Sequence, residues 1–325
     1  MIITRTPLRV SLFGGGTDLP SYYQANHYGQ VLSFAINKHI YISSHPYIDQ
    51  NMILLKYSIQ ELVSEVSEIK HQIFRELIQE FQLKGIDISV TSDIPAGSGL
   101  GSSSAFTVAL YQNLLKYIGK ELNPTEIAMR ACTLEIEKIG EPIGKQDQYA
   151  AAFGGLNYIK FLDNEEVHVK PIEIKENFLS EFNNSLILVK VGSFRFAGQI
   201  LAEQARNLKS DHKINYYHQM KQTVVAGIDA FQQEDLPKIG SILRESWELK
   251  RQLSDRVSTP ETDELIERLI SLGAYGAKLL GAGGGGYVLA IVNHAAKKKI
   301  VENYSNRIIQ VRIEKEGSKV IYANE

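Results

Sequence analysis

The stretch that most constrains this chain runs from Asp93 to Ala105 and reads D-I-P-A-G-S-G-L-G-S-S-S-A. Glycines at positions 97, 99 and 101 allow a tight path with positive φ, on which backbone N–H groups converge without obstruction by Cβ atoms. Three serines follow at positions 102–104. This composition predicts a cradle for an anion, and we call residues 93–105 the phosphate loop.

The segments on either side of the phosphate loop predict a strand before it and a helix after it. Ile86, Ile88 and Val90 alternate with polar residues, as in a half-buried strand. After the loop, apolar residues recur at every fourth position of a helix that should begin near Ser103 or Ser104; they are Phe106, Leu110, Leu114 and Ile118. This arrangement binds phosphate because the first helical turn offers unpaired N–H groups and the positive end of the helix dipole.

Neither of the two familiar glycine motifs accounts for the glycines of this chain. A Walker A loop ends in Gly-Lys-Ser/Thr, whereas the phosphate loop has no lysine, and the segment from Gly140 to Lys145 is one residue too short. Gly281, Gly283 and Gly286 satisfy the spacing G-x-G-x-x-G, but a strand and not a helix is predicted after them. We interpret 277–292 as strand, glycine bend and strand, which places bare backbone against a ligand or another domain; a purely structural hairpin is the alternative.

Composition limits the kind of protein and the kind of partner. The chain has 325 residues, 44% hydrophobic and 22% charged, so it is globular and long enough for one large domain or, as we expect, two. A formal net charge of −2 with interspersed charges predicts a small-molecule partner, with no nucleic acid and no membrane. The single cysteine, Cys132, excludes internal disulfides and a cysteine-based metal cluster, and a cytoplasmic location is expected.

The N-terminal strand predicted over residues 2–13 leads into a glycine turn with two candidate polar residues. Pro7 lies in the middle of this strand, which predicts a split strand or an edge position. Arg9 lies among apolar residues, where a guanidinium usually has an anionic partner. Asp18 follows glycines at 14–16 and can accept hydrogen bonds from sugar hydroxyls; a plain glycine turn with Asp18 as a helix N-cap is the alternative.

The other elements predicted for the first half look like scaffold. Residues 31–36, 39–43 and 52–57 are strand-like, whereas 59–83 has the apolar spacing of a helical hairpin or of one long helix. A further helix should begin with Asn123 as its cap and Pro124 at its first position.

Candidate carboxylates follow in that helix and in the next motif. Glu135 and Glu137 are two positions apart, so they point roughly 200° apart around a helix and at most one of them can face a site. Asp147 precedes three alanines and a Gly-Gly pair, and small side chains permit close packing against another backbone. We interpret Asp147 as a catalytic carboxylate; an N-cap is the alternative.

The second half predicts a separate domain. Residues 176–185 resemble a boundary between domains, and L-I-L-V-K-V at 186–191 predicts a continuous apolar strand. Two helices should fill 197–232 and 235–253, and a third should run from Thr262 to Leu272.

Four motifs, in order along the chain, resemble those of the GHMP kinases, the superfamily of galactokinase, homoserine kinase, mevalonate kinase and phosphomevalonate kinase. The motifs are R-T-P-L-R-V-S-L-F-G-G-G-T-D at 5–18, P-A-G-S-G-L-G-S-S-S-A at 95–105, G-K-Q-D-Q-Y at 144–149 and K-L-L-G-A-G-G-G-G-Y at 278–287. The sequence at 14–23 and 144–155 is most similar to that of the D-glycero-D-manno-heptose 7-phosphate kinases. Galactokinases have a Glu-His pair where Gly15 and Gly16 stand.

The resemblance implies an α+β fold of two domains with the active site between them. Residues 1–180 would form the ATP-binding domain, similar to domain 2 of ribosomal protein S5, and residues 181–325 a ferredoxin-like domain. It also implies that ATP, with Mg²⁺, phosphorylates the anomeric C1 hydroxyl of a sugar phosphate, D-glycero-D-manno-heptose 7-phosphate, to give the 1,7-bisphosphate.

The resemblance further assigns roles to residues of this chain. Asp147 would accept or orient the anomeric proton, and Arg9 would pair with Asp147 or neutralise the transferring phosphoryl group. Ser103 and Glu137 would hold Mg²⁺, with Glu135 as the alternative carboxylate. The ATP phosphates would lie against Pro95, Ala96, Gly97, Ser98, Gly99, Leu100, Gly101, Ser102, Ser103 and Ser104. The sugar phosphate would lie against Gly15, Gly16, Thr17, Asp18, Lys145, Arg195, Gly283 and Gly284, with Lys278 as a further candidate for its phosphate group.

Two other interpretations stay open. One is a kinase of the same class for another sugar, such as fucose or an N-acetylhexosamine. The other is a ligand sensor that keeps the nucleotide cleft without turnover, against which the joint presence of Asp147, Arg9, Ser103 and Glu137 argues. A homodimer is compatible with the sequence, which does not define the oligomeric state.

Overall fold

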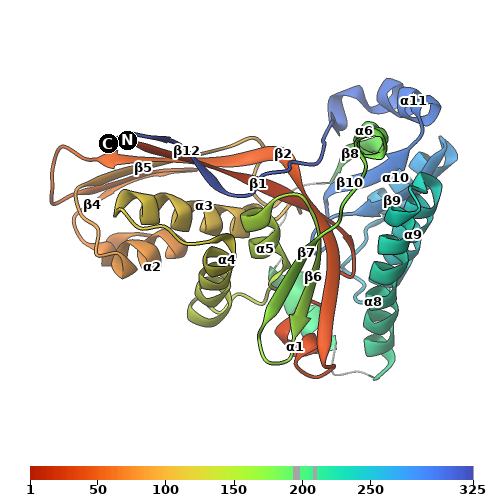
Figure 1. Ribbon diagram of the computed structural model, residues 1–325, viewed down its shortest axis with the longest axis horizontal. Helices are drawn as coiled ribbons and strands as arrows, with labels where there is room; N and C mark the ends of the chain where they lie inside the picture. The colour runs from red at the N-terminus through yellow and green to blue at the C-terminus, as the bar shows by residue number, and fades with distance from the viewer. Residues whose placement is uncertain (193–197, 208–210, 325) are drawn as a thin grey trace.

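The strands of the protein form two sheets at the two ends of an elongated body (Figure 1). The computed structural model describes residues 1–192, 198–207 and 211–324. None of the helices in these ranges combines the length and the apolarity that a bilayer crossing needs.

The first sheet has eight strands, and the N-terminal strand lies inside it. Its order is β12-β1-β2-β5-β3-β4, with β6 pairing with β2 and β7 with β6. All of its pairs are antiparallel except β3 with β5. The strands are β1 (Ile2–Phe13), β2 (Tyr28–Pro46), β3 (Ile53–Lys56), β4 (Gln60–Val63), β5 (Ile86–Ser92), β6 (Leu156–Leu162), β7 (Val167–Pro171) and β12 (Lys319–Ala323).

Helices α2 to α5 cover one face of the first sheet (Figure 1). The apolar side chains of α3 and α5 pack against β1 and β2, which explains why the strand residues on that face are buried. The helices of this half are α1 (Pro20–Tyr23), α2 (Gln72–Glu80), α3 (Ser102–Tyr117), α4 (Pro124–Cys132) and α5 (Gln146–Phe153), with a π turn at Thr133–Lys138 between α4 and α5.

The second sheet has four strands in the order β11-β8-β10-β9, with apolar cores on both faces. Alternate residues of β8 and β10 pack into different cores, which explains why both strands are apolar at almost every position. Its strands are β8 (Leu186–Val191), β9 (Ala274–Leu279), β10 (Gly286–Val292) and β11 (Ile308–Ile309). The helices are α6 (Glu176–Ser185), α7 (Gly198–Asn207), α8 (Asp211–Gln232), α9 (Leu236–Arg251), α10 (Pro260–Ser271) and α11 (His294–Tyr304).

The elements next to the glycine motifs were predicted correctly, and the prediction for residues 59–83 was wrong. Residues 59–83 form β4, a short 3₁₀ turn and α2 and not a continuous helix, because residues 60–63 pair with β3. Residues 176–185 form a helix, α6, which by itself does not test the predicted boundary between domains. The strand containing Pro7 is paired with β2 along its length but with β12 only up to Arg5, and the β1–β2 register shifts after Pro7. The proline therefore lies where β1 has a partner strand on one side only, as predicted. The domain boundary at residue 180 stays a prediction.

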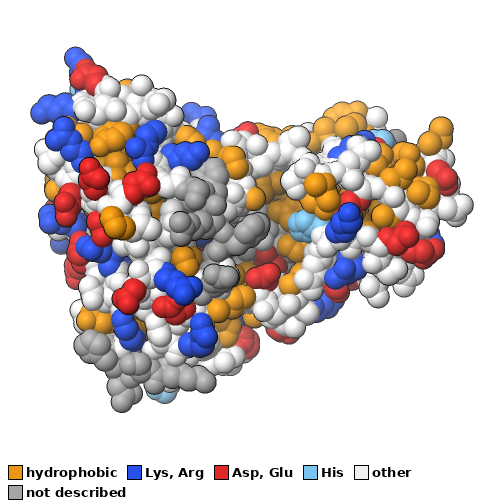
Figure 2. All heavy atoms as spheres, turned by 180° about the vertical axis from the view of Figure 1, so that it is seen from behind, with side chains coloured by type: hydrophobic (Ala, Val, Ile, Leu, Met, Phe, Trp, Pro, Cys, Tyr) orange, Lys and Arg blue, Asp and Glu red, His pale blue; other side chains and the backbone are white. Residues whose placement is uncertain are grey.

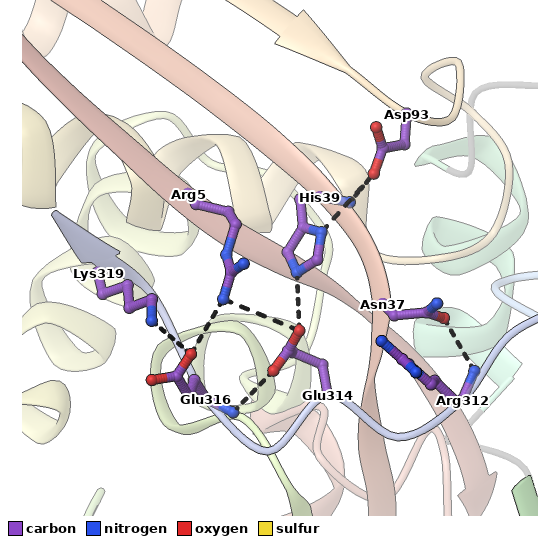
Figure 3. A network of polar contacts seen from close by, with 8 residues as sticks. All are labelled: Arg5, Asn37, His39, Asp93, Arg312, Glu314, Glu316 and Lys319. Carbon is purple, nitrogen blue, oxygen red and sulfur yellow. Dashed lines mark hydrogen bonds and ion pairs between the residues drawn. The ribbon is translucent and has the colours of Figure 1, made fainter. Parts of the chain in front are cut away.

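The C-terminal segment returns to the first sheet, so the two termini lie side by side (Figure 1). Figure 3 shows how its polar side chains join this sheet to the start of the phosphate loop. Glu314 accepts from His39 Nε2 at 3.2 Å, and the backbone N–H of His39 donates to Asp93 at 2.8 Å. Arg5 on β1 pairs with Glu316 at 3.0 Å. This network anchors Asp93, the first residue of the phosphate loop.

Candidate active site

The phosphate loop connects β5 to α3, as predicted, and presents unpaired backbone N–H groups. Gly97, Gly99 and Gly101 have φ of 75°, 80° and 73°, the left-handed region that favours glycine. Within the described ranges, the N–H groups of these three glycines donate to no protein acceptor, and no side chain caps the N-terminus of α3. A loop of this kind ahead of a helix N-terminus is suited to bind phosphate groups.

The phosphate loop lies in backbone contact with the glycine bend, residues 280–286. A Cβ atom on Gly99 would lie 2.7 Å from the carbonyl oxygen of Leu280, and one on Gly286 would lie 2.6 Å from that of Ser98. Neither position therefore accepts a side chain without moving backbone. The two glycine-rich segments, from the two halves of the chain, thus form one site.

Arg9 and Asp147 form a bidentate ion pair beside the phosphate loop. The Nε and Nη2 atoms of Arg9 donate to the two carboxylate oxygens of Asp147, each at 2.7 Å, and Nη1 donates to the carbonyl of Gly99, also at 2.7 Å. The Arg9 side chain is 8% exposed and that of Asp147 is 26% exposed, so a substrate hydroxyl can reach the carboxylate. Asp147 lies in the first turn of α5 but does not cap it, since Lys145 is the N-cap residue.

The glycine turn after β1 is tied to α5 through Asp18. The carboxylate of Asp18 accepts from the N–H of Gly16 at 2.9 Å and from the N–H of Gln146 at 3.2 Å. Burial, and next the charge of Asp147, raise the pKa of Asp18. Asp18 therefore lies near the Arg9–Asp147 ion pair. It caps the start of α5 and not a helix of its own.

Of the residues predicted to touch the sugar in this turn, Thr17 has a structural role and the two glycines remain candidates. The Thr17 hydroxyl is fully buried and lies 2.8 Å from the carbonyls of Gly14 and Gln30, so it joins the turn to β2. A Cβ on Gly16 would lie 3.0 Å from the ring of Tyr217 on α8, so any side chain there would press on that ring. A Cβ on Gly15 would lie 3.0 Å from the hydroxyl of Ser11 on β1.

The structure favours Glu135 over Glu137 as a metal ligand. Glu135 is 1% exposed and accepts from Gln148 Nε2 at 2.7 Å, with Ser104 and Thr107 as further hydrogen-bond partners. Glu137 is exposed, because it lies on the opposite side of the π turn. The geometry therefore favours the alternative named from the sequence, Glu135, and the choice of metal ligand stays a prediction. Burial raises the pKa of Glu135 to about 7.

The donors near Glu135 are of the type that Mg²⁺ prefers. Glu135 has no cationic partner within the described ranges, and the hydroxyl of Ser104, in the first turn of α3, is one of its hydrogen-bond partners. No cluster of three His, Cys, Asp or Glu residues occurs in the part of the chain that the structure describes. One carboxylate and a hydroxyl fit Mg²⁺, which usually completes its shell with water and substrate phosphates.

The cations predicted for the sugar phosphate are mostly engaged elsewhere. Lys145 forms an ion pair with Glu165 and lies 5.4 Å from the centre of the Tyr23 ring. Lys278 is 2% exposed and faces the protein interior. Arg195 lies outside the described residues.

The glycine bend supplies fewer free donors than its composition suggests. The N–H of Gly284 donates to the carbonyl of Val257 at 3.0 Å, so it is not free to bind the sugar. Gly283 packs against the same valine, so its side facing Val257 is closed. In the view from behind, the surface is hollowed between the arm formed by the first sheet and the thicker body (Figure 2). Acidic and basic side chains are interspersed on this face, without a field of one sign (Figure 2).

Two residues near the site were not predicted, Gln148 and Lys250. Gln148 is one position after Asp147 and orients Glu135. Lys250 lies beneath the glycine bend. A signal for it is present in the sequence, because Leu243, Trp247 and Lys250 share one face at helical spacing, which places a lysine among buried residues.

Comparisons with known proteins show the family to which the chain belongs. The chain matches the family models of the GHMP kinases N terminal domain over residues 67–155 and of the GHMP kinases C terminal region over residues 228–310. It is 31% identical to the D-glycero-alpha-D-manno-heptose 7-phosphate kinase of Campylobacter jejuni, with 93% of this chain and 92% of the relative aligned. It is 28% identical to the galactokinase of Pyrococcus furiosus, over 92% of this chain and 91% of the relative.

Solved structures show the same fold. A D-glycero-D-manno-heptose 1-phosphate kinase from Bacteroides thetaiotaomicron superposes with a TM-score of 0.81 at 24% identity, covering 100% of both chains. A putative sugar kinase from Campylobacter jejuni superposes with a TM-score of 0.75 at 25% identity, covering 98% of this chain and 97% of that one.

Proposed function

Because the chain belongs to the GHMP kinases and is an ATP-dependent sugar kinase, we propose that it phosphorylates the anomeric C1 hydroxyl of D-glycero-D-manno-heptose 7-phosphate. The observation that carries the proposal is the Arg9–Asp147 pair, which places a carboxylate beside the phosphate loop while the guanidinium also binds Gly99. The heptose is favoured by the 31% identical relative of that name. It is also favoured by Gly16, where the larger side chain found in galactokinases would press on the ring of Tyr217.

In the proposed mechanism, the protein supplies position and charge neutralisation. The N–H groups of Gly97, Gly99 and Gly101 bind the ATP phosphates, and Asp147 accepts or orients the proton of the anomeric hydroxyl. Arg9 holds both oxygens of Asp147, and its positive charge counters the charge of the transferring phosphoryl group. No covalent intermediate is required.

The metal and sugar contacts complete the proposal. Glu135 and Ser103 would hold Mg²⁺, which would supply positive charge to the phosphate oxygens. Asp18 Oδ1, which faces the turn, binds a sugar hydroxyl. For the 7-phosphate we propose Arg195, because Lys145 is paired with Glu165 and Lys278 faces the interior.

A panel of sugars, assayed by ADP release, tests the proposed substrate. It contains heptose 7-phosphate, heptose, galactose, fucose and an N-acetylhexosamine, and NMR then locates the new phosphate ester. We expect the highest kcat/KM with heptose 7-phosphate and the ester at C1. A preference for another sugar overturns the substrate, and the absence of sugar-dependent ATP consumption with every member would favour a sensor.

The role of Arg195 is tested by the ratio of kcat/KM for heptose 7-phosphate to that for heptose. We expect this ratio to fall in Arg195→Ala, because only the phosphorylated sugar uses the guanidinium. Equal use of the two sugars by the wild-type protein would remove the idea of a phosphate site.

A further inference from the structure

Two lysines are buried behind the glycine bend without an acidic partner. Lys250, on α9, is 8% exposed, and its Nζ donates to the carbonyl oxygens of Leu279, at 3.4 Å, and of Gly281. Lys278, on β9, donates to the carbonyl oxygen of Leu12 at 2.7 Å and to Ser246 at 3.1 Å. Among the described residues, no carboxylate forms an ion pair with either lysine. Burying unpaired ammonium groups is costly, so their presence calls for a reason.

The contact with Lys250 orients one peptide group of the glycine bend. In a trans peptide, the carbonyl and the following N–H point in opposite directions. The carbonyl of Gly281 faces Lys250, so the N–H of Ala282 lies on the other side of that peptide, where it has no acceptor within the ranges described. The carbonyl of Ala282 accepts from Gln204 at 3.2 Å, which fixes the next peptide as well.

Arg9 makes the equivalent contact on the phosphate loop. Its Nη1 binds the carbonyl of Gly99 at 2.7 Å, so the N–H of Leu100 points away from the guanidinium and is also unpaired in the described structure. Gly99 and Gly281 touch, since a Cβ on Gly281 would lie 2.5 Å from the Cα of Gly99. Two buried cations therefore hold the carbonyls of two touching glycine segments, and each leaves a free N–H on the opposite side.

We propose that Lys250 is a positioning residue for phosphoryl transfer, which holds the glycine bend so that its free N–H faces the phosphates bound by the phosphate loop. This inference rests on the proposed function as a kinase, but not on the identity of the sugar. Lys250 also adds positive charge behind the phosphates, and the charged groups that face it are Arg9 from β1 and Lys278 from β9. Burial, and next the charge of Arg9, lower the pKa of Lys250 to about 7, so a nearby anion favours its charged form.

The test compares Lys250→Met with Lys297→Met. Methionine keeps an unbranched apolar side chain of similar length but removes the charge and both hydrogen bonds. Lys297, on α11, is a matched control because its Nζ also donates to a backbone carbonyl, that of Asn184 at 2.7 Å, away from the two glycine segments. The kcat, the KM for ATP and the thermal midpoint are measured with the sugar that the wild-type protein uses best.

We expect kcat to fall at least about tenfold in Lys250→Met, because outright loss of a preorganised donor costs about 10²–10³ in kcat and here the donor is displaced. The KM for ATP should change less than about threefold, since the phosphate loop itself is intact. The control should keep the wild-type kcat.

A kcat for Lys250→Met within about threefold of the control would overturn the inference, whatever the change in thermal midpoint, because a merely structural lysine affects stability and not turnover. If Lys250→Met is not recovered folded, Lys250→Gln is judged by the same ratio. If the heptose assignment is wrong, the sugar panel shows this with the wild-type protein. If the inference on Lys250 is wrong, only the ratio of kcat between Lys250→Met and the control shows it.

Discussion

Replacing Asp147 by Asn separates the chemical role of this residue from its structural role. The substitution keeps the size of the side chain and removes the charge. One of the two 2.7 Å contacts with Arg9 then brings an amide NH₂ against a guanidinium N–H, so at least one charge-assisted hydrogen bond is lost. A hydrogen bond to a charged group contributes about 1.5–3 kcal/mol, and the partial exposure of Asp147 places the expected loss of stability at the lower end, about 1.5 kcal/mol.

The effect of this substitution on turnover should be larger than its effect on stability. General-base assistance is worth about 10²–10⁴ in rate, which corresponds to about 3–5 kcal/mol in the barrier. We therefore expect kcat to fall by about 10²–10⁴, while the KM for ATP stays within about threefold, because Asp147 does not contribute to the N–H groups of the phosphate loop. The assay is ADP release with both substrates saturating, together with urea denaturation.

The matched control for this prediction is Asp87→Asn. Asp87 accepts from Lys56 at 2.6 Å and its side chain is 6% exposed, so it also belongs to an ion pair, but it lies on β5 away from the phosphate loop. We expect Asp87→Asn to lose stability with an unchanged kcat. A kcat for Asp147→Asn within about tenfold of the wild type would refute the role of Asp147 as the base.

Three further predictions follow from the site. Glu135→Gln should raise the Mg²⁺ concentration for half-maximal activity at least about tenfold, whereas Glu137→Gln should leave it unchanged, as a magnesium titration of each variant shows. Gly99→Ala should weaken nucleotide binding at least about tenfold in calorimetry, because φ is 80° and the new Cβ would lie 2.7 Å from the carbonyl oxygen of Leu280; wild-type affinity would contradict the backbone contact. Burial lowers the pKa of Lys250 from 10.5 to about 7, so between these pH values the unfolded chain binds more protons than the folded chain. The free energy of unfolding should therefore rise with pH across this window more in the wild type than in Lys250→Met. If urea denaturation gives the same pH dependence of this free energy for the two proteins, the prediction is contradicted.

What could be predicted from the sequence depended on how local the signals are. The phosphate loop and the hairpin around the glycine bend were predictable because glycines and alternating apolar residues act within a few positions. The segment 59–83 was not, because its first part pairs with β3, a contact that apolar spacing does not encode. The choice between Glu135 and Glu137 also lay beyond the sequence, since a π turn at Thr133–Lys138 sets which side of the chain is buried.

The position of Arg9 explains why its predicted roles need not be alternatives. A guanidinium has five N–H donors in a rigid fork, and here two of its nitrogens bind Asp147 while a third binds Gly99. The orientation of the carboxylate and the path of the phosphate loop are therefore set by one rigid group. A lysine, with a single ammonium centre on a flexible stem, could not reproduce this geometry. The group that orients the acceptor carboxylate thus also shapes the loop for the donor phosphates, which couples the placement of the two reacting partners in a transfer that depends on alignment.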